Sequence, residues 1–235
     1  MDLTGKTCLV TGSSRGIGHA IARALGQSGA HVVINSRSGS DLQKVAKRME
    51  RECKGKVLGV EADISNPIEG ENLISRVVDE FGRLDILVNN AGIGIFQSIE
   101  EMSIKDWKAQ IDTKLLGTFV CSHSAIPYLL RTEGWIVNVG SLACRNAFAG
   151  GTGYNASKFG LLGMTEAMML DLRSKGIRVS IVMPGSVDTS FAGGHSKNWA
   201  LTSEDVAAAI LHLLSYPKNA HTSRIEMRPS KPPSA

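Results

Sequence analysis

The stretch Thr11-Gly12-Ser13-Ser14-Arg15-Gly16-Ile17-Gly18 follows a short apolar run and precedes a helical pattern. It is typical of a glycine-rich turn between a strand and a helix. Glycines there let the backbone approach a pyrophosphate closely, and the helix start offers free N–H groups and a positive dipole end. The spacing is G-x-x-x-G-x-G rather than the G-x-G-x-x-G of many dinucleotide sites. The turn therefore predicts an anion-binding site, although glycines can also serve such a turn alone.

Short β-branched runs alternate with helical patterns along the whole chain. This alternation is typical of an α/β fold with a parallel sheet covered on both faces. Strands are expected at residues 7–11, 31–35, 56–61, 84–88, 135–139, 178–182 and 225–228. We predict one doubly wound, Rossmann-like domain over residues 1–228, with about seven strands. Its cofactor half covers about 1–140, its catalytic and substrate half about 141–228, and residues 229–235 form a frayed tail.

Capping residues predict where two helices begin. Asn66 precedes a proline and stands three residues before Glu69, a pattern typical of a helix N-terminus. Ser103 and Asp106 have the same spacing. We therefore expect helices to start just after Asn66 and Ser103.

The composition argues against several classes of protein. The 235 residues carry a net charge of +4, and the dense basic cluster at 44–56 is interrupted by acids. Such a run is typical of a solvated helix face, so we expect no nucleic-acid partner. The four cysteines form no C-x-x-C pair and the six histidines form no ligand-spaced group, so we expect no metal. Without a signal peptide or an apolar run of about 20 residues, we expect a cytoplasmic protein with no membrane partner.

Residues at the end of the second expected strand bear on which dinucleotide could bind. An NAD site would place an Asp or Glu about 20 residues past the glycines, to hold the ribose 2′-hydroxyl. The chain has Asn35-Ser36-Arg37-Ser38 there, without an acid. Arg37 and Arg15 could grip a 2′-phosphate with charge-assisted hydrogen bonds, whereas a carboxylate would repel it. We therefore expect NADP(H), with ordinary surface arginines as the alternative.

Three polar side chains offer acid/base chemistry. Tyr154 and Lys158 stand four apart where a helix opens, so they share a face and the ammonium can lie near the phenol. A phenol has a pKa of about 10, and a nearby cation lowers that pKa toward the range of proton exchange. Ser141 follows the fifth expected strand and could donate a hydrogen bond to a substrate oxygen. We predict Tyr154 as the acid/base, although each residue alone could be an ordinary surface or capping residue.

Taken in order, these motifs resemble those of the short-chain dehydrogenase/reductase family. The glycine-rich turn, Asn89-Asn90-Ala91-Gly92, Ser141, the Y-x-x-x-K pair and Pro184-Gly185-Ser186-Val187-Asp188-Thr189 follow one another as in that family. The resemblance runs from about residue 3 to residue 189. It implies hydride transfer between NADP(H) and a carbonyl or alcohol carbon. It also implies a homodimer or homotetramer that pairs through helices near residues 106–130 and 154–174.

The resemblance implies roles for individual residues as well. Lys158 would also hold the nicotinamide ribose, and Asp63 would approach the adenine. Asn90 and Gly92 would flank the cofactor, and Val187 and Thr189 would meet the carboxamide. The expected cofactor-binding residues are Gly12, Ser14, Arg15, Gly16, Ile17, Gly18, Ser36, Arg37, Ser38, Asp63, Ile64, Asn90, Ala91, Gly92, Tyr154, Lys158, Pro184, Gly185, Val187 and Thr189.

Lys114 departs from the family pattern. It stands three residues before Gly117, where the family usually has an asparagine that is thought to help hold a water joining the active-site lysine to solvent. If the backbone makes that contact, lysine is tolerated. If the side chain makes it, proton relay should suffer, or a second ammonium should lower the pKa of Lys158 by like-charge repulsion. We therefore place Lys114 beside Ser141, Tyr154 and Lys158 as a candidate catalytic residue with an open role.

The substrate is less well defined. Residues 190–201 leave room for only a short lid before a helix that we start near residue 202. Gly193-Gly194 could be its hinge. Four aromatic residues could form an apolar pocket wall or pack in the core: Phe96, Phe148, Phe191 and Trp199. We expect a small, partly apolar carbonyl or alcohol substrate.

Three other functions remain open at this stage. A 3-oxoacyl-carrier-protein reductase is one, although the D-G-G ending common in those enzymes is absent. An NAD-dependent secondary alcohol dehydrogenase is another. A dinucleotide-binding redox sensor without turnover is the third, favoured by Lys114 alone and disfavoured by the intact Ser141, Tyr154 and Lys158.

Overall fold

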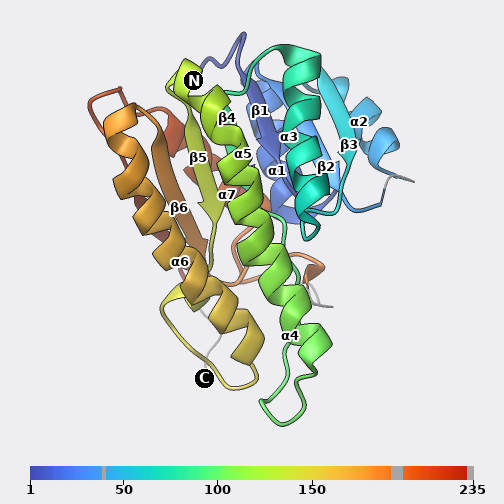
Figure 1. Ribbon diagram of the computed structural model, residues 1–235, viewed down its shortest axis with the longest axis vertical. Helices are drawn as coiled ribbons and strands as arrows, with labels where there is room; N and C mark the ends of the chain where they lie inside the picture. Colours follow the sequence, from blue (N-terminus) through green and yellow to red (C-terminus); the bar gives the residue numbers. More distant parts are fainter. Residues whose placement is uncertain (39–40, 192–197, 232–235) are drawn as a thin grey trace.

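The computed structural model describes residues 1–38, 41–191 and 198–231, and in it the glycine-rich turn follows the strand that lies third across a seven-stranded parallel sheet (Figure 1). The strand order is β3-β2-β1-β4-β5-β6-β7, and each neighbouring pair is parallel. The strands are β1 (Thr7–Val10), β2 (His31–Ser36), β3 (Val57–Glu61), β4 (Ile86–Asn89), β5 (Trp135–Val139), β6 (Arg178–Pro184) and β7 (Arg224–Met227). The predicted doubly wound fold class is confirmed.

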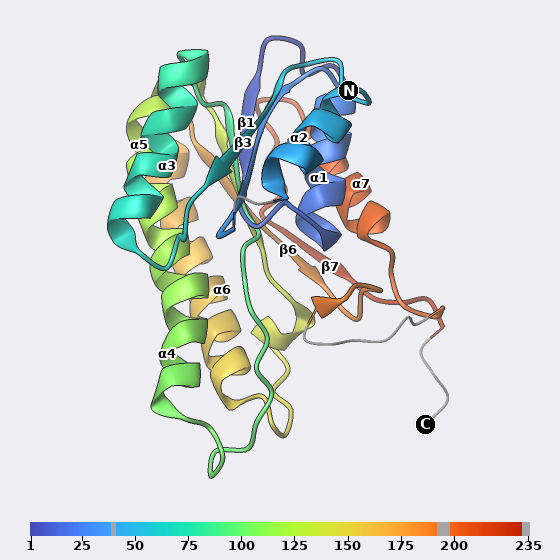
Figure 2. The same ribbon diagram turned by 90° about the vertical axis from the view of Figure 1, so that its right-hand side faces the viewer.

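Helices cover both faces of the sheet (Figure 2). On one face lie α1 (Gly16–Gln27), α2 (Leu42–Glu50) and α7 (Ser203–Leu214), and on the other lie α3 (Pro67–Phe81), α5 (Gly117–Thr132) and α6 (Thr152–Leu172). Because side chains alternate along a strand, neighbouring residues enter different cores. Thus Val10 packs with the α1 side and Leu9 with the α3 side.

The element ends follow the capping signals closely. The Asn66 side chain accepts a hydrogen bond from the Ile68 N–H at 3.1 Å, and Ser103 accepts one from the Asp106 N–H at 3.0 Å. The strand limits agree with the expected ones to within two residues, the usual uncertainty of such boundaries. Helix α6 begins at Thr152, two residues before Tyr154.

The helical region around residues 106–130 is not one regular helix. It consists of α4 (Ile104–Ile111), a π-helical turn over Asp112–Leu116, and α5. A π-helical turn adds a residue to the helical repeat and is frequent at functional sites. Lys114 lies within this turn, which therefore sets the direction of its side chain.

The sheet topology fixes where a ligand can bind. Strand β1 pairs with β2 on one side and β4 on the other, so the chain reverses its direction of travel across the sheet between β3 and β4. In open α/β sheets, ligands bind at the carboxyl ends of the strands beside such a switch point. In Figure 1 these ends face the lower part of the molecule.

Candidate active site

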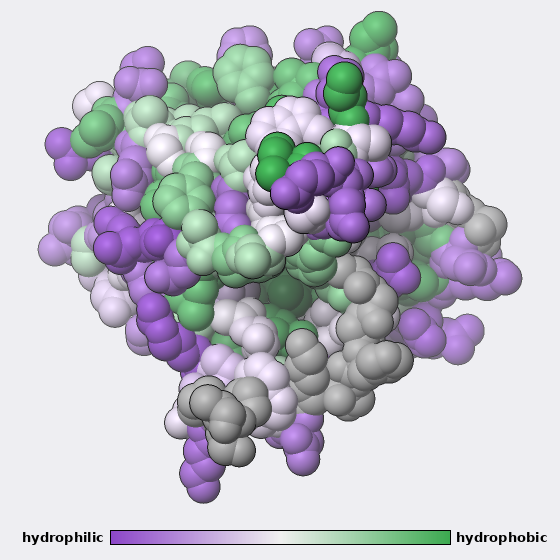
Figure 3. Space-filling view, turned by 90° about the horizontal axis from the view of Figure 1, so that it is seen from below, coloured by the Kyte–Doolittle hydropathy of each residue, from purple (hydrophilic) through white to green (hydrophobic). Residues whose placement is uncertain are grey.

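A cleft of about 1330 Å³ opens at the carboxyl ends of the strands, around the β1–β4 switch point. Figure 3 looks into this hollow from below, with apolar side chains in its floor. All the expected cofactor-binding residues line it, and so do Ser141, Tyr154, Lys158 and Lys114. The fold therefore brings together, in one cavity, residues from positions 12 to 189 of the sequence.

The glycine-rich turn forms one end of the cleft. Gly12 has a φ of +61°, and a Cβ atom there would lie 2.7 Å from the Ala91 Cα. A Cβ at Gly18 would lie 2.4 Å from the Asn90 Nδ2. Helix α1 begins at Gly16 without a side-chain cap and without an acid in its first turn. Its N–H groups and positive dipole end are thus available to an anion.

Two asparagines hold this turn in place. Asn90 Nδ2 donates to the carbonyls of Thr11 and Gly12, at 3.0 and 2.9 Å. Asn35 Oδ1 accepts from the Gly12 N–H at 3.3 Å, while its Nδ2 donates to the carbonyls of Val60 and Ala62. Asn35 therefore ties β1, β2 and the end of β3 together. This role of Asn35 could not be predicted from the sequence, because only the sheet register shows where its amide points.

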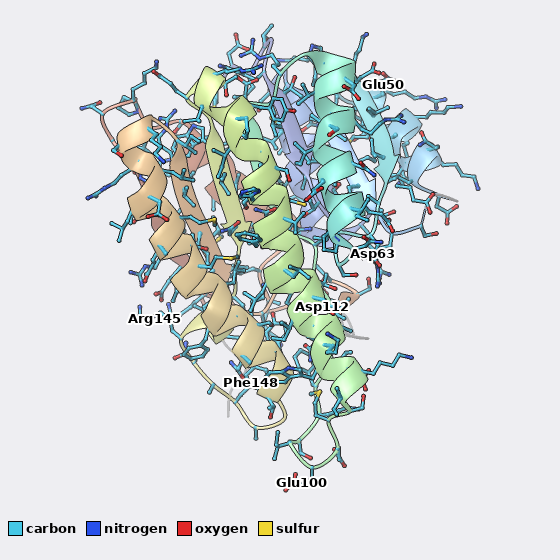
Figure 4. All side chains as sticks on the ribbon, in the orientation of Figure 1. Glu50, Asp63, Glu100, Asp112, Arg145 and Phe148 are labelled. Carbon is cyan, nitrogen blue, oxygen red and sulfur yellow. The ribbon has the colours of Figure 1, made fainter. Side chains whose placement is uncertain are left out.

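The arginine end of the cleft carries free positive charge. Arg15 and Arg37 are exposed, and neither forms an ion pair within the described parts of the chain. Asp41 also lines this end and pairs with Lys44 at 3.4 Å. The carboxylate of Asp63, labelled in Figure 4, accepts hydrogen bonds from Ser65. Both guanidinium groups thus remain able to bind a phosphate.

Ser141, Tyr154 and Lys158 meet at the other end of the cleft. Ser141 lies close enough to Tyr154 for its hydroxyl to act on the phenol, whose pKa it lowers. Lys158 Nζ donates to the carbonyls of Val139 and Gly140, at 2.9 and 3.1 Å, and so ties α6 to the end of β5. Ser141 Oγ also accepts from the Ala143 N–H at 3.1 Å. A hydroxyl, a phenol and an amine therefore share one small, largely buried volume.

The acid strength of Tyr154 differs from the sequence-based expectation. We expected the Lys158 ammonium to lower the pKa of the phenol, but burial raises that pKa, and only the Ser141 hydroxyl opposes the rise. The reason is that the Lys158 amine titrates below the phenol and carries little charge when the phenol ionises; its Nζ also lies 5.8 Å from the Tyr154 ring centroid and is directed at two backbone carbonyls. Burial also lowers the pKa of Lys158 to about 8.

Lys114 is buried in the same volume, with 2% of its surface exposed. Its Nζ donates to Gln110 Oε1 at 3.1 Å and to Ser157 Oγ at 3.0 Å, and lies 4.1 Å from the centroid of the Tyr154 ring. Burial, followed by the charge of Lys158, lowers the pKa of Lys114 to about 6. The like-charge repulsion between the two lysines was expected to lower the pKa of Lys158. It lowers the pKa of Lys114 instead.

Three phenylalanines surround Tyr154 at the mouth of the cleft. Phe96 lies 5.2 Å from its ring centroid, and Phe148 and Phe191 each lie 6.2 Å from it. Each of the three is partly exposed and lines the cleft, and Figure 4 labels Phe148 near the lower end of α6. They form the expected apolar wall. Trp199 does not line the cleft in the described part of the chain, and Gly193-Gly194 lies outside the described residues.

Three further polar residues shape this end of the cleft and were not predicted. Gln110 holds the loop after β4, because its side chain donates to and accepts from the backbone of Ile95. Ser157 donates to the Tyr154 carbonyl at 2.7 Å. Asn155 donates to two carbonyls of the loop before α6. A spacing of three residues from Tyr154 to Ser157 was the available signal, since it places both at the start of one helix.

The described residues contain neither a candidate metal-binding group nor a helix that could span a membrane. No group of three His, Cys, Asp or Glu side chains there could hold a metal ion. Within the same part of the chain, no helix has both the length and the apolar character to cross a bilayer.

Comparison with known proteins gives a consistent result. A family model described as short chain dehydrogenase matches residues 6–199. An uncharacterized oxidoreductase of Staphylococcus saprophyticus is 32% identical over 97% of this chain and 99% of its own length.

Two solved structures are similar along nearly their whole length. An alcohol dehydrogenase from the archaeon Thermococcus sibiricus, complexed with 5-hydroxy-NADP, superposes with a TM-score of 0.91 at 29% identity, covering 98% of this chain and 99% of that chain. A short chain dehydrogenase from Burkholderia cenocepacia, in complex with NADP, superposes with a TM-score of 0.88 at 34% identity. The match covers 97% of this chain and 98% of that chain.

Proposed function

The chain is an oxidoreductase of the short-chain dehydrogenase family, and we propose that it transfers a hydride between NADP(H) and a carbonyl or alcohol carbon. One observation carries the proposal. A Ser–Tyr–Lys group lies at one end of the cleft, and the other end is an uncapped helix N-terminus with two arginines that form no ion pair among the described residues. The first end suits proton transfer and the second suits a phosphorylated dinucleotide.

The residues present fit such a cofactor. A Cβ at Gly12 would overlap Ala91, so the turn can pack this closely on the residues after β4 only with glycine there. Gly16, Ile17 and Gly18, at the uncapped start of α1, line the cleft where a pyrophosphate would bind. Arg15 and Arg37 would hold a 2′-phosphate, and Asp63 would approach the adenine. The two solved relatives described above, which contain NADP or 5-hydroxy-NADP, support the preference over NAD. When bound, the nicotinamide supplies the hydride acceptor or donor.

The protein's own residues would handle the proton. Ser141 would donate a hydrogen bond to the substrate oxygen, and Tyr154 would give that oxygen its proton as negative charge develops there. The raised pKa of Tyr154 suits this direction, because a buried phenol keeps its proton until an alkoxide forms. Lys158, fixed by two carbonyls, would position the phenol and the nicotinamide ribose.

The substrate end supports a small, partly apolar carbonyl or alcohol. Phe96, Phe148 and Phe191 would contact its carbon skeleton, while Ser141 and Tyr154 would contact its oxygen. Such a wall gives affinity through apolar area and directs the polar atom toward the phenol.

The outer surface supports a homo-oligomer. Phe119 of α5, together with Phe159 and Leu170 of α6, exposes 44 to 57% of its surface. Helices α5 and α6 lie on the same outer face in Figure 1. Apolar side chains on neighbouring helices are the kind of surface that a second copy of the chain would cover.

A substrate screen tests the proposal. Ketones, aldehydes and 3-ketoacyl thioesters are offered with NADPH, and the loss of NADPH absorbance is followed. We expect reduction of at least one class by the wild-type protein and none by Tyr154→Phe. The proposal would be contradicted if the wild-type protein does not bind NADPH. It would also be contradicted if the wild-type protein and Tyr154→Phe reduce a substrate at the same rate.

A further inference from the structure

The Lys114 amine is buried and has no counter-ion among the described residues. No carboxylate of the described residues pairs with it, and the one charged group that influences its pKa is the like-charged Lys158. The other groups around its Nζ, Gln110 from α4 together with Ser157 and Tyr154 from α6, carry no charge at neutral pH. A buried charge without a partner is costly, so such a group is retained where it has a function.

The surroundings of the amine match a protonated lysine. An ammonium has three N–H donors, and three acceptors surround Nζ: Gln110 Oε1, Ser157 Oγ and the face of the Tyr154 ring. Ser157 already donates its own hydrogen to the Tyr154 carbonyl, so it can only accept from Lys114. A neutral amine has one N–H fewer and would turn its lone pair toward the electron-rich ring. The geometry thus favours the ammonium.

Burial and Lys158 act against that geometry. They lower the pKa of Lys114 to about 6, so most molecules lack this proton at pH 7 in the free protein. The acceptors around Nζ suit a charged amine, whereas burial and the Lys158 charge disfavour that charge. Negative charge entering the cleft would remove this mismatch.

We propose that Lys114 binds a proton when the anionic dinucleotide enters the cleft, so that the protein takes up a proton together with its cofactor. The inference rests on the proposed function, because it takes NADPH as the ligand. Lys114 lines the same cleft as the glycine-rich turn and the two arginines, and NADPH brings several phosphate charges into it. One opposite charge about 10 Å away, at an effective dielectric of about 20, raises the pKa of an amine by about one unit.

The bound proton gives Lys114 a role as a positioning residue for Tyr154. Reduction of a carbonyl consumes one hydride and one proton, and the proton that Tyr154 gives to the substrate oxygen leaves a phenolate. An ammonium 4.1 Å from the ring centroid stabilises that phenolate until solvent returns a proton. Lys114 therefore acts through Tyr154 and itself transfers no proton to the substrate.

Calorimetry tests the inference without turnover. NADPH is titrated into the protein at pH 7 in buffers of different ionisation enthalpy, and the dependence of the binding heat on buffer gives the number of protons taken up. A pKa that rises from about 6 to about 7 changes the protonated fraction from roughly one tenth to roughly one half, an uptake of roughly 0.4 proton.

Four proteins make the comparison specific. Lys114→Met removes the amine, Lys114→Gln keeps an N–H donor that does not titrate, and Lys105→Met changes an exposed lysine of α4 as the control. The 2′-phosphate, whose second pKa is about 6, also exchanges a proton on binding, but it does so equally in all four proteins. The difference in proton uptake between the four proteins therefore reports on Lys114 alone.

The expected result is a proton uptake that is lower by roughly 0.4 in both Lys114 variants and unchanged in Lys105→Met. An equal uptake in all four proteins, with NADPH bound, would overturn this inference and leave the proposed function intact. Absence of NADPH binding to the wild-type protein would overturn both. If one Lys114 variant does not bind NADPH, the other variant decides. A wild-type proton uptake in that other variant would also overturn the inference.

Discussion

Lys114→Met should stabilise the free protein, and the gain should shrink as the pH rises. The amine loses its proton near pH 6 in the folded protein and near its ordinary value of 10.5 in the unfolded chain. Between these values the unfolded chain binds more protons, so wild-type stability increases with pH. Methionine has no such titration. The variant should therefore lack this slope.

The size of the effect follows from the same shift. Each unit of pKa difference corresponds to about 1.4 kcal/mol, so the buried amine costs the folded state roughly 6 kcal/mol near pH 6. Removing it also removes two hydrogen bonds, which offsets about 2 kcal/mol. Gln110 and Ser157 keep their other partners, Ile95 and the Tyr154 carbonyl, so neither is left unsatisfied. The net gain is roughly 4 kcal/mol at pH 6 and falls by about 1.4 kcal/mol per pH unit.

Urea unfolding at pH 6, 7.5 and 9 measures this slope. All proteins are compared at one concentration, because the stability of an oligomer depends on concentration. Lys105→Met, at an exposed position of α4, should follow the wild-type profile. Parallel pH profiles for wild type and Lys114→Met would refute the lowered pKa of the buried amine.

Three further changes test other parts of the site and the surface. Arg37→Asp should reverse the preference for NADPH over NADH in fluorescence titrations, and equal wild-type affinities would contradict the phosphate assignment. Lys158→Ala should lower both kcat, by at least tenfold, and cofactor affinity, because it removes the two hydrogen bonds that tie α6 to the end of β5. A loss in kcat alone would show that Lys158 acts in proton transfer and does not hold the cofactor. Phe119→Asp should shift the protein toward smaller species in light scattering, and a wild-type protein that is monomeric at all concentrations would refute the oligomer.

The fold could be predicted from local patterns because its determinants are local. Apolar runs placed every strand to within two residues, and the caps at Asn66 and Ser103 placed two helix starts. The glycine-rich turn pointed to the cleft because its spacing is set within eight residues, from Thr11 to Gly18. Such local signals can be recognised in the sequence without knowledge of the tertiary structure.

The details that were missed depend on how elements cross. The i, i+4 spacing placed Tyr154 and Lys158 on one face, but it did not show that Lys158 would reach two carbonyls of another element rather than the phenol. The π-helical turn has no recognisable pattern in the sequence, and it directs Lys114 against the Tyr154 ring. The contact of Lys114 with Ser157 likewise requires the π-helical turn to lie against α6.

The most direct test of the account is the comparison of Tyr154→Phe with the wild-type protein on one substrate found in the screen. The change removes a single hydroxyl and keeps the ring that packs against Phe96 and Lys114. We predict that NADPH binds with nearly unchanged affinity while kcat falls by about 10²-fold or more, as expected for the loss of a general acid. Reduction of that substrate at close to the wild-type rate would contradict the assignment of Tyr154 and the mechanism built on it.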